Sequence, residues 1–352
     1  MKIGVDYSSV ILQKTGIGSF TARLVEAMRR QSNGVEFHLY QPKNARDLNT
    51  PQRIFWEAVL LPQKASKDRV DVLYSPGFSP PALGSFSKIV TVHDLIGLIY
   101  PGNVGAVSRF YWSRWLPHNI KKADRLVASS ESTRRDIVRF LGIPEKRVTV
   151  VLPAASPSFR RLENQDFVKE VMARYNVRTP YFISVGTLEP RKNLLRLLRA
   201  FERLCAKPRD ISLVIAGKPG GVQREIERFV AEKSLAERVK ILGYVSDEEL
   251  VAFYNAAVGF VMISLYEGFG LPALEAMSCG LTGVVSNNSS LPEVVGNTAL
   301  QVNPEDVDAI TEGLETLVRD SSFRVKLSAC AHERSKTFSI EKTAGEMLKI
   351  FK

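Results

Sequence analysis

The feature that most restricts the fold of this chain is an alternation of short apolar segments with amphipathic segments, which occurs in two successive series. Short β-branched runs that end in turn-forming residues are typical of buried parallel strands, and the 3.6-residue patterns between them are typical of helices. In the first series we predict strands at residues 2–5, 70–74, 89–92, 125–128 and 148–151, and helices at 17–30, 107–122 and 131–141. In the second series we predict strands at 181–185, 213–216, 239–242, 258–263 and 283–286, and helices at 194–205, 222–233, 247–255 and 272–279.

Two such series predict two doubly wound α/β domains that face a shared cleft. Residues 153–159 form the predicted linker, because Pro153 and Pro157 stand among small residues and break both periodicities. We therefore expect an N-terminal domain at 1–158 and a C-terminal domain at 159–337. The last helical pattern, at 340–351, is expected to cross back, so that residues 338–352 complete the first domain.

The composition is that of a globular protein. The chain has 352 residues, of which 45% are hydrophobic and 24% charged, and this excludes collagen-like and disordered classes. Three widely spaced cysteines argue against a disulfide framework or a metal cluster and fit a reducing cytosol. Asp6 lies inside the first predicted strand, so we expect no signal peptide, and the longest apolar run, 256–265, is too short to cross a bilayer.

The net charge of +11 belongs entirely to the first half of the chain. Residues 1–160 hold 23 Lys+Arg and 12 Asp+Glu, whereas residues 161–352 hold 25 of each. Such an asymmetry indicates that one domain binds nucleic acid, an anionic membrane or a phosphorylated ligand; a basic soluble surface without a partner is the alternative.

Ligands of open α/β sheets bind beyond the carboxyl ends of the strands, so the residues there are the candidates for function. Gly16 and Gly18 precede a helix, where backbone N–H groups approach an anion, although a simple tight turn is the alternative. Thr21 stands where a dinucleotide fingerprint has its third glycine, which disfavours NAD. His93 follows the strand at 89–92 and would donate to a sugar hydroxyl or a phosphate, unless its role is structural.

Two further segments lie in the second half. Arg191 and Lys192 follow a strand and open a helix, where two cations are unfavourable without an anion; they predict a diphosphate clamp rather than a solvated surface pair. The segment 264–275 holds two carboxylates, Glu267 in a loop and Glu275 in the helix that follows. One of them is expected to face the cleft floor and the other to reach a diol such as a ribose. Gly268 and Gly270 let backbone amides approach a ligand there; an ordinary loop followed by a helix-capping acid is the alternative.

These two segments, together with Cys279-Gly280, the run 289–296 and Gly16-Ile17-Gly18, closely resemble the family-4 retaining glycosyltransferases of GT-B fold. The resemblance covers nearly the whole chain and is dense from residue 181 to 304. It implies transfer of a sugar from a nucleotide-diphosphate donor to an acceptor hydroxyl, with retention at the anomeric carbon and without a metal or other cofactor. The form of the segment 186–193 is most similar to mannosyltransferases of bacterial surface polysaccharide assembly, so GDP-mannose is the first expected donor.

The resemblance also implies roles for matching residues. Arg191 and Lys192 would neutralise the diphosphate, Glu275 would bind the ribose, and Glu267 would bind the donor sugar. His93 would meet that sugar near the reacting carbon, and Gly16 and Gly18 would lie over the diphosphate. Further donor contacts are expected from Thr187, Gly217, Gly243, Tyr244, Gly268, Phe269, Gly270 and Leu271.

The chain departs from the commoner family pattern in several places. Thr187 stands where many relatives have Arg, and Arg191 is expected to take over that charge. Ile263 replaces a frequent Pro, and Thr282-Gly283 replace a frequent Pro-Val, at strand ends where packing is affected more than chemistry. One Asp-x-Asp sequence, at 306–308, matches the pattern of metal-dependent transferases, but its place at a helix start favours a capping role.

Retention without a metal restricts the mechanism. A retaining hydrolase needs two carboxylates about 5 Å apart, and we find no convincing nucleophilic carboxylate near His93. Front-face attack within an ion pair, with the departing phosphate as the base, is therefore expected.

The acceptor side is indicated by a mixed aromatic and basic segment at 108–122, which suits an anionic membrane surface and a lipid-linked glycan acceptor. Part of its aromatic side chains would instead belong to the core, and Pro117 predicts a kink or a helix end. The residues expected at this surface are Arg109, Trp112, Arg114, Trp115, Lys121 and Lys122. We expect a cytoplasmic protein at the inner face of the membrane.

Three other functions are compatible with parts of the sequence. The charge of +11 suits a nucleic-acid-binding protein, but no recognition module is present, so no nucleic-acid partner is expected. A non-catalytic sugar-binding protein is disfavoured because Lys192, Glu267 and Glu275 are all present. A GT-B epimerase or phosphorylase is the other enzymatic alternative; the phosphorylases need a pyridoxal lysine, for which no signature is found.

Overall fold

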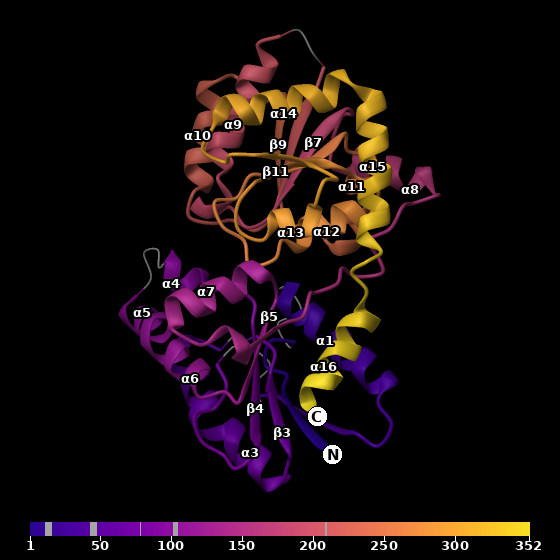
Figure 1. Ribbon diagram of the computed structural model, residues 1–352. Coiled ribbons are helices and arrows are strands. Elements are labelled where there is room, and N and C mark those ends of the chain that lie inside the picture. Colours follow the sequence, from indigo (N-terminus) through magenta and orange to yellow (C-terminus); the bar gives the residue numbers. More distant parts are fainter. Residues whose placement is uncertain (11–15, 43–47, 78, 101–104, 208–209) are drawn as a thin grey trace. The chain divides into compact units, whose positions relative to one another are not determined.

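The computed structural model describes residues 1–10, 16–42, 48–77, 79–100, 105–207 and 210–352. The chain divides into two compact units, Met1–Ala154 with Phe338–Lys352, and Ala155–Thr337. The division falls slightly before the predicted boundary at residue 158. Each unit contains one parallel six-stranded sheet covered by helices, which confirms the predicted α/β class (Figure 1).

The sheet of the first unit has the strand order β2-β1-β3-β4-β5-β6, and all neighbours are parallel. The strand order reverses between β1 and β3, which makes their carboxyl ends the switch point of this sheet. The strands are β1(Lys2–Asp6), β2(Glu36–Tyr40), β3(Val72–Ser75), β4(Ser87–Val92), β5(Arg125–Ala128) and β6(Val148–Val150). The helices are α1(Gly16–Gln31), α2(Thr50–Phe55), α3(Leu61–Lys67), α4(Ile96–Ile99), α5(Ala106–Phe110), α6(Leu116–Lys121) and α7(Glu131–Leu141), with the π-helical turns η1(Trp56–Leu60) and η2(Tyr111–Trp115) and the 3₁₀ turn η3(Glu145–Arg147).

The C-terminal helix α16(Ile340–Phe351) belongs to the first unit. Leu24 and Met28 of α1 share one buried cluster with Met347 and Ile350 of α16. The apolar face of α16 therefore packs against α1, and residues distant in sequence complete one core (Figure 1).

The sheet of the second unit has the order β12-β11-β10-β7-β8-β9, again with parallel neighbours. Its switch point lies between β7 and β10. The strands are β7(Tyr181–Val185), β8(Ser212–Ala216), β9(Val239–Gly243), β10(Gly259–Met262), β11(Gly283–Ser286) and β12(Leu300–Val302). The helices are α8(Gln165–Arg174), α9(Leu194–Cys205), α10(Gln223–Glu232), α11(Asp247–Ala256), α12(Leu271–Ser278), α13(Leu291–Val295), α14(Val307–Arg319) and α15(Ser321–Ser335), with the 3₁₀ turn η4(Pro190–Lys192).

The prediction missed one strand in each sheet, β2 and β12. Both lie at sheet edges and are largely half-exposed or exposed, so neither has the apolar run by which the central strands were found.

The helix predicted at 107–122 is present as one helical run over residues 106–121, formed by α5, the π-helical turn η2 and α6. The backbone N–H of Leu116 bonds to the carbonyl of Tyr111, and Pro117 follows directly. The same arrangement occurs at η1, where the N–H of Leu61 bonds to the carbonyl of Trp56 and Pro62 follows directly. Proline cannot donate to the fourth preceding carbonyl, and the widened turn lets each helix continue past it.

Candidate functional site

The candidate site lies at the switch point of the second sheet, where the loops after β7 and β10 meet. The backbone N–H of Leu265 donates to the carbonyl of Arg191 at 2.8 Å, which joins the two loops. Asn193, in the left-handed conformation with φ 59°, donates its side-chain amide to the carbonyls of Ile263 (3.1 Å) and Pro304 (2.7 Å). This buried amide therefore fixes the start of α9 against the end of β10.

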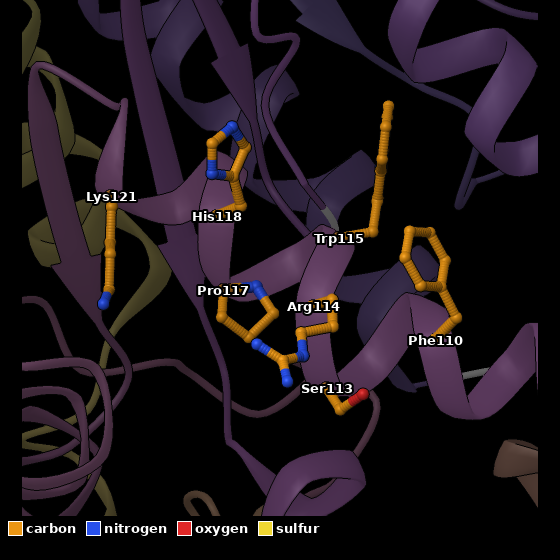
Figure 2. A pocket seen from close by; sticks show the side chains of 7 residues that line it. All are labelled: Phe110, Ser113, Arg114, Trp115, Pro117, His118 and Lys121. Carbon is orange, nitrogen blue, oxygen red and sulfur yellow. The ribbon is translucent and has the colours of Figure 1, made fainter.

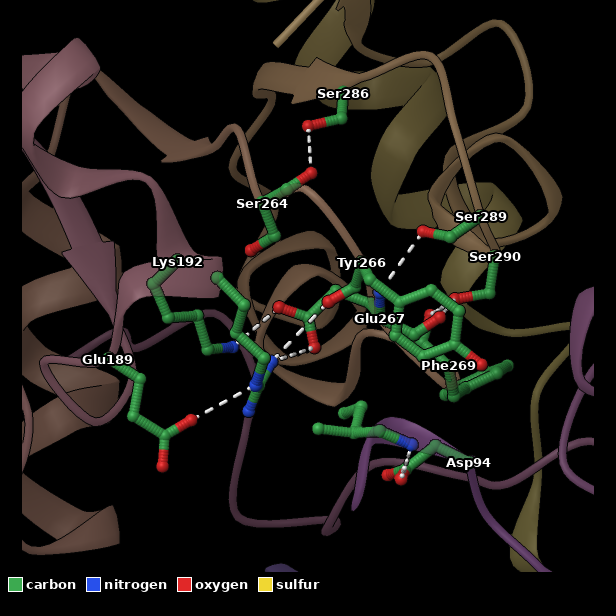
Figure 3. Close-up of polar contacts among 12 residues, drawn as sticks. Asp94, Glu189, Lys192, Ser264, Tyr266, Glu267, Phe269, Ser286, Ser289 and Ser290 are labelled. Carbon is green, nitrogen blue, oxygen red and sulfur yellow. Dashed lines mark hydrogen bonds and ion pairs between the residues drawn. The ribbon is translucent and has the colours of Figure 1, made fainter. Parts of the chain in front are cut away.

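Four charged side chains form one connected group in these loops (Figure 3). Lys192 Nζ lies 2.6 Å from Glu267 Oε1, and Arg191 Nη1 lies 3.1 Å from Glu267 Oε2. Arg191 Nε lies 3.0 Å from Glu189 Oε2, and Glu189 is the most exposed of the four. Burial alone would raise the pKa of Glu267, but the charges of Lys192 and Arg191 outweigh it and hold that pKa below its ordinary value.

This arrangement corrects the electrostatic argument made from the sequence. The two cations lie in the turn η4, and α9 begins only at Leu194, so they do not face a helix N-terminus directly. The carboxylates of Glu267 and Glu189 balance them within the protein. No role was predicted for Glu189, because its spacing of two residues from Arg191 is not a helical pairing distance and only the turn brings the groups together.

Two serines hold the loop that contains Glu267. Ser290 Oγ lies within hydrogen-bonding distance of the carbonyl oxygens of Glu267 (2.9 Å) and Phe269 (2.8 Å), which share its one proton, and the Glu267 backbone N–H donates to Ser289 Oγ (3.1 Å) (Figure 3). Both serines lie in the run 289–296 that carried the resemblance, but the sequence assigned them no role. The loop, including Gly268 and the buried Phe269, is thereby fixed before α12 begins.

Helix α12 starts from Gly270, whose φ of 101° is a conformation that glycine adopts readily. Leu271 is its first residue, and Glu275 follows one turn later and is half-buried. Glu267 and Glu275 therefore come from the loop and the helix that the sequence predicted for them.

The loops after β7, β8 and β9 form a second connected group. A Cβ atom on Gly217 would lie 2.0 Å from the carbonyl oxygen of Gly186, so the loop that continues into Thr187 requires glycine at 217. The N–H of Gly217 donates to the carbonyl of Gly243 at 2.7 Å. Tyr244 follows Gly243 with its ring exposed.

The predicted site residues of the first unit lie at the ends of its own strands and helices. Gly16 is the first residue of α1 and Gly18 is buried in its first turn; residues 11–15 lie outside the described part of the chain. His93 Nε2 lies 2.7 Å from the carbonyl oxygen of Pro76. Since a carbonyl only accepts, Nε2 carries the proton, and burial lowers the pKa of the ring. In this arrangement Nε2–H is bonded within the protein and Nδ1 is left as an acceptor, and the contact of His93 with substrate stays a prediction.

The surface predicted at 108–122 is only partly present. Arg109, Arg114, Lys121 and Lys122 are exposed. Trp112 is half-buried, and its ring packs against a buried cluster of the first unit, so closely to Gly97 that a Cβ there would lie 2.3 Å from it. Trp115 is half-buried and donates Nε1–H to Glu57 Oε2 at 2.9 Å, since the π-helical turn directs its indole toward that carboxylate.

The Asp-x-Asp sequence caps a helix. Asp306 accepts hydrogen bonds from the N–H groups of Asp308 (2.9 Å) and Ala309 (3.0 Å), and Asp308 pairs with Arg203. Among the residues that the structure describes, no three His, Cys, Asp or Glu side chains come together as a metal site. None of the described helices has the length and apolarity to span a bilayer.

The fold and the site together define a class of proteins. Two units with parallel doubly wound sheets, one of them with paired cations at its switch point, are the architecture of GT-B glycosyltransferases. Residues 169–334 match the family model described as Glycosyl transferases group 1, and residues 15–159 match that of Glycosyltransferase Family 4. The chain belongs to this glycosyltransferase family.

Individual relatives agree with this assignment. The Escherichia coli protein named O-antigen chain mannosyltransferase B is 32% identical over 94% of this chain and 83% of its own length. An enzyme of Campylobacter jejuni, named as an N-acetylgalactosaminyltransferase acting on a sugar-diphospho-undecaprenol, is 26% identical over 62% of this chain and 60% of its own. The structure of sucrose-phosphate synthase from Thermosynechococcus elongatus superposes with a TM-score of 0.77 at 19% identity, covering 100% of this chain and 98% of that one, and is similar in fold.

Proposed function

We propose that this protein is a retaining hexosyltransferase that moves mannose from GDP-mannose to a hydroxyl of a glycan or lipid-linked glycan in surface polysaccharide assembly. The observation that carries the proposal is the pair of cations, Arg191 and Lys192, held at the switch point between β7 and β10. The mannosyl group is supported by the O-antigen mannosyltransferase that is similar over most of this chain.

The cations would stabilise the leaving group. As the bond to the anomeric carbon breaks, negative charge accumulates on the nucleoside diphosphate, and Arg191 and Lys192 are already held in place to meet it. The bound diphosphate would replace Glu189, the most exposed carboxylate of the group, and share the cations with Glu267. Glu267 would then turn its remaining acceptor capacity to the hydroxyls of the donor sugar.

Retention would follow from front-face attack. The acceptor hydroxyl approaches the anomeric carbon on the side from which the diphosphate departs, and its proton passes to an oxygen of that phosphate. No carboxylate nucleophile is needed, and Arg191 and Lys192 supply the positive charge that a metal provides in other transferases. The proposed reaction is therefore independent of metals and of other cofactors.

The acceptor side is proposed from a groove in the first unit. It has a volume of about 400 Å³, with the rings of Phe110 and Trp115 at one end and Lys121 at the other (Figure 2). Arg114 and His118 also line it, with Ser113 and Pro117, and no carboxylate is among the lining residues. We propose that this groove contacts anionic lipid at the cytoplasmic face of the membrane, where a lipid-linked acceptor would be presented; the undecaprenol-linked substrate in the name of the Campylobacter relative supports this.

The reaction is tested with GDP-mannose, a lipid-linked acceptor extract and an NMR assignment of the anomeric configuration in the product. Lys192→Ala and Glu275→Ala are each expected to lower kcat/KM at least 100-fold, in line with the loss of one strong polar contact in a transition state. Near wild-type rates in both variants would overturn the assignment of the site. A thermal-shift panel of GDP, UDP and ADP identifies the donor class, because a bound ligand raises the melting temperature.

Membrane contact is tested by sedimentation with vesicles that contain anionic phospholipid. The double variant Arg114→Glu/Lys121→Glu is expected to lose binding at low salt, whereas Lys326→Glu, on α15 of the other unit, retains it. Absence of wild-type binding at low salt would remove the membrane part of the proposal and leave the transfer reaction unaffected.

A further inference from the structure

The second unit has a pocket at the amino edge of its sheet, whereas the candidate site lies at the carboxyl edge. The pocket has a volume of about 180 Å³ and is lined by residues at the amino ends of β8 and β9 and by the segment 176–178, which precedes β7. A strand of five residues such as β8 spans about 16 Å. The pocket is therefore separate from the site that contains Arg191 and Lys192.

One face of β8 and β9 contributes Val214 and Lys240 to the pocket. Leu213 and Val239 belong to the buried cluster that these strands share with α9, α10 and α14. Because successive side chains of a strand point to opposite faces, Val214 and Lys240 emerge on the other face, where they are direct neighbours in the ladder. The pocket thus combines a buried apolar side chain with a cation beside it.

The lining of the pocket has a local excess of positive charge. Arg178, Arg238 and Lys240 are three cations, and Glu237 is the one carboxylate among the lining residues that the structure describes, which leaves a net charge of +2. Arg178 and Lys240 are exposed, and within the described part of the chain neither is paired with a carboxylate. Arg238 is half-buried and also interacts with Cys205. Since the second half of the chain as a whole is neutral, this excess is a feature of the pocket.

Neutral hydrogen-bonding groups and the volume complete the description of the pocket. The amide of Asn176 and the hydroxyl of Ser212 are both in the lining and are able to donate to an anion. A volume of about 180 Å³ corresponds to about six water molecules in the liquid. That is room for one phosphate group and part of the molecule that carries it. A guanidinium binds two phosphate oxygens at once, and an ammonium adds a point charge.

We propose that this pocket binds a dianionic phosphate group, either free phosphate or the phosphomonoester of a small molecule such as a sugar phosphate. Arg178 and Arg238 would donate to the phosphate oxygens, and Lys240 would complete the neutralisation of the charge. Two negative charges balance the excess of the lining. The carbon atoms of a phosphomonoester would pack on Val214, the buried apolar residue of the lining.

The test is an NMR titration of protein with labelled valine methyl groups, in which sodium phosphate is added at constant ionic strength. The Val214 signal should shift and saturate, because Val214 lines the pocket. Arg178→Gln/Lys240→Gln should weaken binding at least about ten-fold, since two charged donors are lost. Arg199→Gln/Lys326→Gln removes the same charge from exposed positions on α9 and α15 and should bind phosphate as the wild type does. All substituted side chains are exposed, so the melting temperatures of both variants should stay close to that of the wild type.

Glucose 6-phosphate and glucose distinguish the two sources of the phosphate group. Tighter binding of glucose 6-phosphate than of phosphate identifies a phosphomonoester as the ligand, and equal or weaker binding identifies free phosphate; glucose alone should cause no shift. The inference is overturned if Val214 does not respond to phosphate, or if the two double variants bind phosphate equally. It is also overturned if only Val185, at the carboxyl end of β7, responds, because phosphate would then bind at the paired cations. Each of these outcomes leaves the proposed transfer reaction unaffected.

Discussion

The ammonium of Lys192 lies 2.6 Å from the carboxylate of Glu267, and neither side chain is more than 10% exposed. Glu267 follows β10 and Lys192 follows β7, so the pair joins the two strands on either side of the switch point. A buried pair of this kind is costly to break, because removing one member leaves an uncompensated charge away from water.

The first prediction follows from this pairing. Lys192→Met and Glu267→Gln are each expected to lower the free energy of unfolding by about 3 kcal/mol, and the double variant by less than the sum of the two. Urea denaturation of the four proteins at pH 7 measures the coupling. Additive losses would show that the two groups do not stabilise one another.

The same carboxylate predicts a loss of stability in acid. The pKa of Glu267 in the folded protein is held below its ordinary value of 4.5, so its contribution is fully present above that value and is lost as the pH falls through the folded pKa. Wild-type protein should therefore lose more stability between pH 5 and pH 3 than Glu267→Gln, which has no proton to gain. Parallel curves for the two proteins in urea titrations would contradict the prediction.

The raised pKa of Glu57, in the first unit, leads us to expect the opposite dependence of stability on pH. Burial raises the pKa of Glu57 to about 8, although hydrogen bonds from Trp115 and Tyr111 favour its charged form. Between pH 4.5 and 8 the folded state holds a proton that the unfolded state releases, so stability falls as the pH rises, by up to about 1.4 kcal/mol per pH unit. Glu57→Gln should show a flatter curve and exceed the wild type in stability at pH 8.

Asp6 is a second buried carboxylate that affects this measurement. Burial also raises its pKa, so it contributes to the dependence of stability on pH with the same sign as Glu57. Asp6→Asn should also flatten the curve, and its effect should not add to that of Glu57→Gln, because the charge of Asp6 contributes to the raised pKa of Glu57. A wild-type free energy of unfolding that does not change from pH 5 to pH 8 would contradict both assignments.

A substitution at Gly97 tests how closely the half-buried ring of Trp112 packs against the first unit. A Cβ at residue 97 would meet the Trp112 ring at 2.3 Å, so Gly97→Ala is expected to destabilise the protein by about 1–3 kcal/mol. Trp112→Ala should likewise lower the melting temperature. Gly105→Ala, where an added Cβ meets nothing within 4 Å, is the matched control and should leave the melting temperature nearly unchanged.

The variant Asp306→Ala distinguishes a helix-capping role of Asp306 from a role as a metal ligand. Asp306→Ala should lower the free energy of unfolding by about 1 kcal/mol, since it removes the acceptor for two N–H groups of α14. Transfer activity should be unchanged in this variant and in wild-type protein assayed with EDTA. Activity that disappears in EDTA would overturn the capping assignment and the metal-independent reaction together.

Most of the central fold follows from local pattern. The strands at 125–128, 181–185 and 283–286 and the helices at 131–141, 194–205 and 340–351 have the predicted bounds, because buried parallel strands and amphipathic helices carry their period in the sequence. The two edge strands lack such a period. The π-helical turns before Pro62 and Pro117 were missed because a proline alone indicates a break, and neighbouring packing decides whether the helix resumes.

The sequence by itself determined which residues stand after which strands, and so it brought Arg191, Lys192, Glu267 and Glu275 into one candidate site. Only the tertiary structure decided their partners. Glu267 lies between the two cations, because the loops after β7 and β10 fold together from distant parts of the chain. Trp112 packs against Gly97, and the turn η4 brings Glu189 to Arg191. Sequence spacing sets the face and the edge on which a side chain emerges, but strand order sets what it meets there.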